Sequence, residues 1–134
     1  MTDLTTTPYA ALLLRLSLGV LFIAHGLLKV LVFTLPGTAG FFESIGIPGI
    51  LAYPVTAAEI GGGVLLVAGY QTRWVALALV PVLVGATLVH LPNGWVFSSP
   101  NGGWEYPALW TVLLFVQALL GNGAYAVGTR TEAA

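Results

Sequence analysis

The chain has 134 residues, of which 57% are hydrophobic and 7% are charged, with four basic and five acidic side chains. Soluble domains carry about 25% charged residues, so this composition excludes a free globular enzyme with a water-exposed surface. The high hydrophobic content excludes a disordered chain, and the net charge of -1 excludes the basic surface that nucleic-acid binding needs. The chain has no cysteine, which excludes disulfides, thiolate metal sites and CxxC redox chemistry within it.

The apolar stretches predict a single transmembrane domain over residues 1–134. Crossing the hydrocarbon core takes about 20 apolar residues, and stretches of that size are separated here by turn signals such as Pro-Gly and Asn-Gly. The expected spans are residues 9–33, 50–70, 72–91 and 105–125, with outer loops at 34–49 and 92–104. We therefore predict an all-α integral membrane protein, a four-helix bundle of antiparallel transmembrane helices with a polar interior seam.

Basic and aromatic residues near the span ends predict orientation. Arg73 and Arg130 lie near one side of the membrane, which places both termini in the cytoplasm, while Lys29 counts against this topology. The loop 34–49 is expected to form a short amphipathic piece in the interface. Three tryptophans suit an aromatic belt better than a role as stacking partners: Trp95, Trp104 and Trp110.

The first span carries its ionisable groups on one helical stripe. The spacing is 3-4-3-4, which is the interior seam of a left-handed bundle, for Arg15, Leu18, Phe22, His25 and Lys29. A charged side chain at the centre of a membrane helix costs at least ~2.5–3.5 kcal/mol, so each of these groups needs a partner or a function.

Depth along the helices predicts a polar pocket that opens outward. At 1.5 Å per residue, four ionisable side chains share the outer half of the bundle: His25, Lys29, His90 and Glu105. Glu59 lies below them and, with Arg15, is expected to form the floor. Hydrogen-bond partners for Glu59 and His90 are expected one turn away, at Thr56 and Thr87.

Two interpretations of these polar residues remain open. In the functional one, Glu59 carries protons because an unpaired membrane carboxylate favours its protonated form. His25 is then the second catalytic group, since two histidines at similar height permit hydrogen bonds to a quinone, proton transfer or, least favoured, haem ligation. In the structural interpretation, Glu59 pairs with Arg15 or Lys29 and holds the helices in register. Neither interpretation predicts a metal site.

Several short motifs run from the first span to the second outer loop: Arg15, Gly19, His25-Gly26-Leu27-Leu28-Lys29, Gly40-Phe41, Gly46-Ile47-Pro48, Glu59-Ile60-Gly61-Gly62, Gly69-Tyr70-Gln71-Thr72-Arg73, His90 and Asn93-Gly94. In this combination they resemble the DoxX family of small four-helix membrane proteins. The resemblance implies a protein of the bacterial or archaeal cytoplasmic membrane connected with respiratory redox chemistry. A quinone is the cofactor it favours, to be bound by His25, Lys29, Glu59, His90, Arg15 and Glu105.

The resemblance and the residues lead to three alternative functions. The first is a membrane subunit that binds a quinone and acts with a partner oxidoreductase, soluble or membrane-bound, since a chain without cysteine, flavin or haem motifs is not expected to be an enzyme alone. The second is a proton-coupled permease with Glu59 as the coupling acid, which a homo-oligomer would favour. The third is a purely structural assembly factor in which the polar seam is packing. In all three cases the lipid bilayer is an expected partner.

Overall fold

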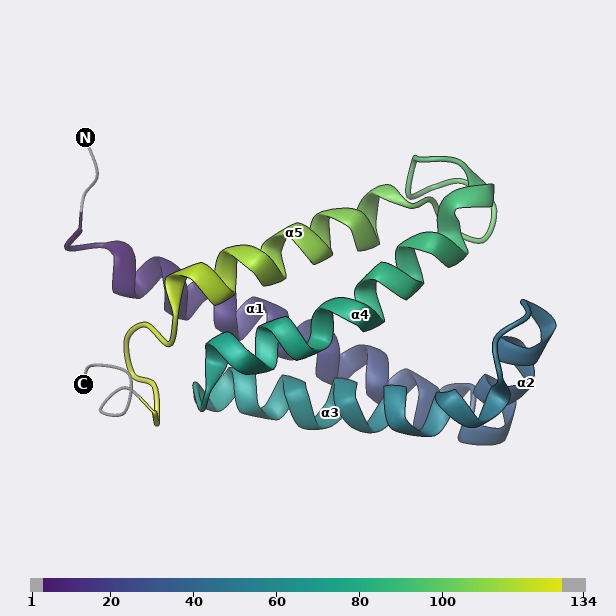
Figure 1. Cartoon of the computed structure of the whole chain (residues 1–134), viewed down its shortest axis with the longest axis horizontal. Helices are drawn as coiled ribbons and strands as arrows, with labels where there is room; N and C mark the ends of the chain where they lie inside the picture. The colour runs from purple at the N-terminus through teal and green to yellow at the C-terminus, as the bar shows by residue number, and fades with distance from the viewer. Residues whose placement is uncertain (1–3, 129–134) are drawn as a thin grey trace.

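The computed structural model describes residues 4–128, and all regular secondary structure in that range is helical. The α-helices are α1 (Thr7–Leu27), α2 (Leu35–Ser44), α3 (Ala52–Ala68), α4 (Thr72–His90) and α5 (Glu105–Leu120). A π-helical turn extends α1, and 3-10 turns precede α3 and follow α4: Leu28–Val32, Gly49–Leu51 and Leu91–Asn93. Helices α1, α3, α4 and α5 form the bundle and α2 lies beside one end of it (Figure 1). The predicted all-α membrane bundle is confirmed.

Within the described residues, three helical segments are long and apolar enough to cross a membrane: Thr7–Val32, Gly49–Ala68 and Thr72–Asn93. The fourth, α5, has 16 residues, or about 24 Å at 1.5 Å per residue. It ends at Leu120 rather than at residue 125, because Gly121 takes a φ of 78° that leaves the helical region. Arg130, which was counted for orientation, lies outside the described residues.

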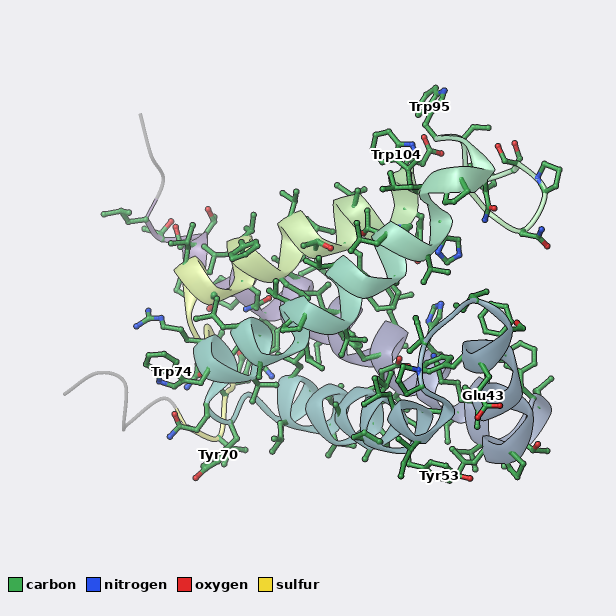
Figure 2. All side chains as sticks on the ribbon, turned by 45° about the vertical axis from the view of Figure 1, so that its right-hand side comes forward. Glu43, Tyr53, Tyr70, Trp74, Trp95 and Trp104 are labelled. Carbon is green, nitrogen blue, oxygen red and sulfur yellow. The ribbon has the colours of Figure 1, made fainter. Side chains whose placement is uncertain are left out.

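The two ends of the bundle differ. One end, the loop end, carries α2 and the loop of residues 91–104. The other, the terminal end, carries the start of α1, the turn between α3 and α4, and the C-terminal segment, residues 121–128. Figure 2 shows Trp95 and Trp104 at the loop end, and Tyr70 and Trp74 at the terminal end. Aromatic side chains at both ends are typical of a membrane-spanning bundle.

Helices pack most closely in two pairs, α1 with α3 and α4 with α5. In the first pair, a Cβ atom on Gly19 would lie 2.8 Å from the carbonyl oxygen of Gly63, and a Cβ on Gly63 would lie 2.8 Å from that of Gly19. Only glycine allows two helix backbones to approach this closely. The pairs meet near the terminal end and diverge toward the loop end (Figure 1).

The interior is part apolar and part polar, and it contains the predicted seam of α1. Arg15, Leu18 and Phe22 are each 1% exposed. Leu66 of α3, Leu79 and Leu83 of α4, and Leu114 of α5 complete the apolar core. Buried polar side chains lie toward both ends of this core: Arg15, Thr38, Thr56, Glu59, Thr72, Gln117 and Asn122.

Candidate ligand-binding site

Two of the cavities at the loop end lie where the helix pairs diverge, and a third, of about 480 Å³, lies beside them between the π-helical turn and α2. The histidine cavity, about 420 Å³, lies between α1, α4, α5 and the 91–104 loop and is lined by His25, Leu83, Ala86, His90, Phe97, Gly102, Gly103, Tyr106, Pro107 and Trp110. The ion-pair cavity, about 370 Å³, lies between the π-helical turn, α2, α3 and α4, and its lining includes Lys29, Glu59, Gly85, Ala86 and His90. His90 and Ala86 line both, so the expected single pocket is divided in two at His90.

The ion pair of the second cavity joins α1 to α3. Lys29 Nζ donates to Glu59 Oε2 at 3.0 Å, and the side chains are 19% and 5% exposed. Lys29 lies in the π-helical turn, a local widening of the helix that is frequent at functional sites. Of the two partners proposed for Glu59 in the structural interpretation, the structure therefore selects Lys29.

The two histidines of the first cavity have one ring nitrogen each in contact with their own helix. His25 Nδ1 lies 2.8 Å from the carbonyl oxygen of Leu21, and His90 Nδ1 lies 2.6 Å from that of Ala86. A Cβ on Gly102 would lie 3.6 Å from His90 Nε2, so the 91–104 loop covers that side of the ring. Thr56 and Thr87, expected as hydrogen-bond partners of Glu59 and His90, instead donate to the carbonyls of Ala52 and Leu83 in their own helices.

Trp110 belongs to this cavity, and its assignment to an aromatic belt is wrong. The side chain is only 7% exposed, and its ring centroid lies 4.8 Å from that of His25 in an edge-to-face arrangement. Among the described residues its indole nitrogen has no hydrogen-bond partner. The sequence carries the signal that would have placed it, since Pro107, Trp110, Leu114 and Gln117 follow the 3-4-3 spacing of an interior stripe and all four are buried.

Arg15, expected in the floor of the pocket, lines neither cavity. Its guanidinium lies near the terminal end and donates to four backbone carbonyls. Nη1 reaches the oxygens of Leu66 and Val67 at 3.1 and 2.6 Å. Nε and Nη2 reach those of Asn122 and Ala124 at 3.0 and 2.8 Å.

This arrangement completes the end of α3. The last four carbonyls of a helix have no partner within it. In α3, Leu65 O accepts from the amides of Gly69 and Tyr70, and Ala68 O accepts from Val127 N. Arg15 donates to the two carbonyls between them, those of Leu66 and Val67. Arg15 is therefore a structural cap that also holds the C-terminal segment against the bundle.

Glu105 also has a local partner. Its Oε1 accepts a hydrogen bond from Phe97 N at 2.9 Å, and the residue begins α5. A carboxylate in the first turn of a helix interacts favourably with the helix dipole. Glu105 therefore orders the 91–104 loop that covers the histidine cavity, and it is not among the residues that line the cavity.

The predicted site residues thus fall into three groups. His25 and His90 share one cavity, Lys29 and Glu59 share the adjoining one with His90, and Arg15 and Glu105 support the fold at opposite ends. Within residues 4–128, no three histidine, aspartate or glutamate side chains gather into a group that could hold a metal ion. Fold and site together define a small helical membrane protein with two adjoining, mostly apolar cavities at one end of its bundle, each lined by ionisable side chains.

Comparison with known proteins places this architecture in a family. The sequence pattern of the DoxX family matches residues 10–91, which is more than half of the chain, and the protein belongs to this family. The match covers α1 to α4, and with them every predicted site residue except Glu105. No solved structure matches the chain.

Two relatives are informative. A Bacillus subtilis (strain 168) protein named "Putative oxidoreductase CatD" is 43% identical over 77 residues, which cover 58% of this chain and 56% of that protein. An uncharacterised protein of Haemophilus influenzae is 32% identical over 126 residues, which cover 92% of this chain and 91% of its own. The matched region therefore spans little more than half of the CatD chain.

Proposed function

We propose that this DoxX protein binds a quinone-class redox molecule in the histidine cavity and acts with a partner oxidoreductase. The observation that carries the proposal is the set of uncommitted polar groups in one membrane cavity, namely two imidazole Nε2 atoms and the Trp110 indole N–H. Its volume of about 420 Å³ falls within the range of about 300–1,000 Å³ that is usual for small-molecule sites.

The adjoining ion pair supplies the proton chemistry in this proposal. Conversion of a quinone to its hydroquinone takes up two electrons and two protons, and the electrons come from the partner, whose class is a redox enzyme. His90 lines both cavities, and its Nε2 is the ring nitrogen that remains for proton exchange at the wall between the ring site and the cavity that holds Glu59, because Nδ1 is held by Ala86 O. The name of the relative CatD, which contains the word oxidoreductase, supports the redox class.

Mass spectrometry of organic extracts from the purified protein tests this proposal. Quinone is expected to be enriched over the lipid of the source membranes, and the enrichment is expected to fall in His25→Ala and Trp110→Phe. Thr111→Val is the matched control, because Thr111 lies next in α5, donates only to Pro107 O and lines neither cavity. Absence of enrichment in the wild-type protein would refute ligand binding.

Orientation belongs to the same proposal. We place the protein in a bacterial or archaeal cytoplasmic membrane with both termini on the cytoplasmic side, supported by the position of Arg73 at the terminal end. Because the chain has no cysteine, the labelling of a single introduced cysteine can be measured without background from other thiols of the protein. Ser98→Cys, in the exposed 91–104 loop, is expected to react with an impermeant maleimide added outside intact cells, and Leu4→Cys is expected to react only after lysis.

A second candidate function is a proton-coupled permease, favoured by the buried carboxylate of Glu59 in its own cavity. It predicts that a pH gradient drives solute flux in proteoliposomes and that Glu59→Gln abolishes this flux. The quinone proposal predicts no such flux, so the assay separates the two.

A further inference from the structure

The hydrogen bonds of the two histidines fix which ring nitrogen carries the proton. A backbone carbonyl oxygen only accepts, so the 2.8 Å contact of His25 Nδ1 with Leu21 O and the 2.6 Å contact of His90 Nδ1 with Ala86 O require a proton on each Nδ1. In a neutral imidazole the other nitrogen then has a lone pair and no hydrogen. Both rings line the histidine cavity, that of His90 beside Gly102, and each keeps an acceptor at Nε2 rather than the donor that a quinone carbonyl needs.

Trp110 supplies the complementary group. The indole N–H can only donate, it is buried, and no described residue accepts from it. A buried donor left unsatisfied costs about as much as a lost hydrogen bond, so an oxygen-bearing ligand in this cavity gains by accepting from it. Besides Tyr106, which is 45% exposed and whose hydroxyl can donate or accept, the polar side chains of the cavity are thus two acceptors and one donor.

Resting on the proposed function, we infer that the histidine cavity selects the reduced, dihydroxy form of its ring ligand over the oxidised form. Each hydroxyl of a hydroquinone can donate to an imidazole Nε2, and its oxygen can still accept from the indole N–H. A quinone has only carbonyl oxygens, so it can use the indole donor and leaves both Nε2 atoms without a hydrogen. The bound hydroquinone thus makes one or two more hydrogen bonds than the bound quinone, which corresponds to about tenfold higher affinity.

Equilibrium binding under anaerobic conditions tests this selectivity. The probes are a decyl-substituted dimethoxymethyl benzoquinone, its hydroquinone, and the dimethyl ether of that hydroquinone, measured at pH 8, where free imidazole is neutral. The hydroquinone is expected to bind about tenfold more tightly than the quinone. The dimethyl ether, which keeps both oxygens and loses both O–H groups, is expected to bind no better than the quinone.

Glutamine at either histidine position tests the cause of the selectivity. The amide of His25→Gln or His90→Gln offers an N–H donor as well as an oxygen acceptor, so the ratio of the two affinities is expected to fall toward one. Thr111→Val is expected to keep the wild-type ratio, since it lines neither cavity. Equal affinities in the wild-type protein, or tighter binding of the quinone, would overturn the inference and leave the proposed function in place. Failure of all three probes to bind would overturn the proposed function itself.

The tautomers can also be measured without a variant or a ligand. The chain has two histidines, so an untagged protein labelled with ¹⁵N-histidine gives two sets of ring signals in micelles. Protonated Nδ1 and unprotonated Nε2 signals from both rings at pH 8 are the expected result. A proton on Nε2 of either ring would overturn the inference.

Discussion

Replacing Arg15 by methionine should destabilise the protein without altering its ligand site. The guanidinium makes four hydrogen bonds to buried or partly buried carbonyls, two at the end of α3 and two in the C-terminal segment. Interhelical polar contacts in membrane proteins average about 0.6 kcal/mol, so four give roughly 2.4 kcal/mol. Of the four carbonyls, only those of Leu66 and Asn122 take part in fully buried bonds, and each costs about 1–3 kcal/mol when it is left without a donor. We therefore expect the free energy of unfolding to fall by ~2–6 kcal/mol.

Titration with sodium dodecyl sulfate in mixed micelles, followed by circular dichroism, measures this change. Arg73→Met is the matched control, because Arg73 is also a cationic residue at the terminal end but makes a single bond, from Nε to Ala118 O at 2.9 Å. We expect a loss of about 0.6 kcal/mol there. Equal midpoints for the two variants would refute the capping role. Lost ligand binding in folded Arg15→Met would refute its assignment as a purely structural residue.

Two further predictions concern the pairing of α1 with α3. Removing one member of the ion pair, in Lys29→Met or Glu59→Gln, should destabilise the protein more than the double variant does, because a lone buried charge is less stable than no charge at all. A double-mutant cycle in the same detergent titration measures this coupling. Additive effects of the two substitutions would show that the pair is not coupled. Gly63→Ala should lower the unfolding midpoint, because the new Cβ would lie 2.8 Å from Gly19 O. Gly61→Ala should keep or raise the midpoint, because its Cβ would have no neighbouring atom within 4 Å and alanine favours the helix. Similar shifts in both variants would contradict the close backbone contact.

Periodicity and length predicted most of the fold. Apolar stretches separated by Pro-Gly and Asn-Gly signals located the helices, and the 3-4-3-4 stripe identified Arg15, Leu18 and Phe22 as interior residues, as their burial confirms. The same reasoning placed the end of the fourth span at residue 125, because apolar residues recur after the Gly121-Asn122-Gly123 turn signal, whereas the positive φ of Gly121 already ends α5.

The site was harder to predict because helix phase gives the face and depth of a residue but not its partner. Arg15 lies on the predicted interior stripe, yet its four acceptors are backbone carbonyls, which no side-chain pattern encodes. Trp110 was assigned by residue type, which for tryptophan in membranes favours the interface, rather than by its own stripe. Depth along the helices predicted that His25 and His90 lie near one another, but only the tertiary structure shows that both line the histidine cavity.

The unequal ends of the bundle have a mechanical consequence. At the terminal end, Arg15 and the C-terminal segment tie the first helix pair to the chain that leaves the second, whereas the cavities lie between the pairs at the loop end. Hydrogen bonds therefore join the two pairs at the terminal end, whereas toward the loop end α1 and α5 meet through the rings of Phe22, His25 and Trp110. Ring contacts can shift without the loss of a hydrogen bond, so we expect a ligand that enters from the bilayer to separate the pairs at the loop end and to leave the Arg15 cap intact.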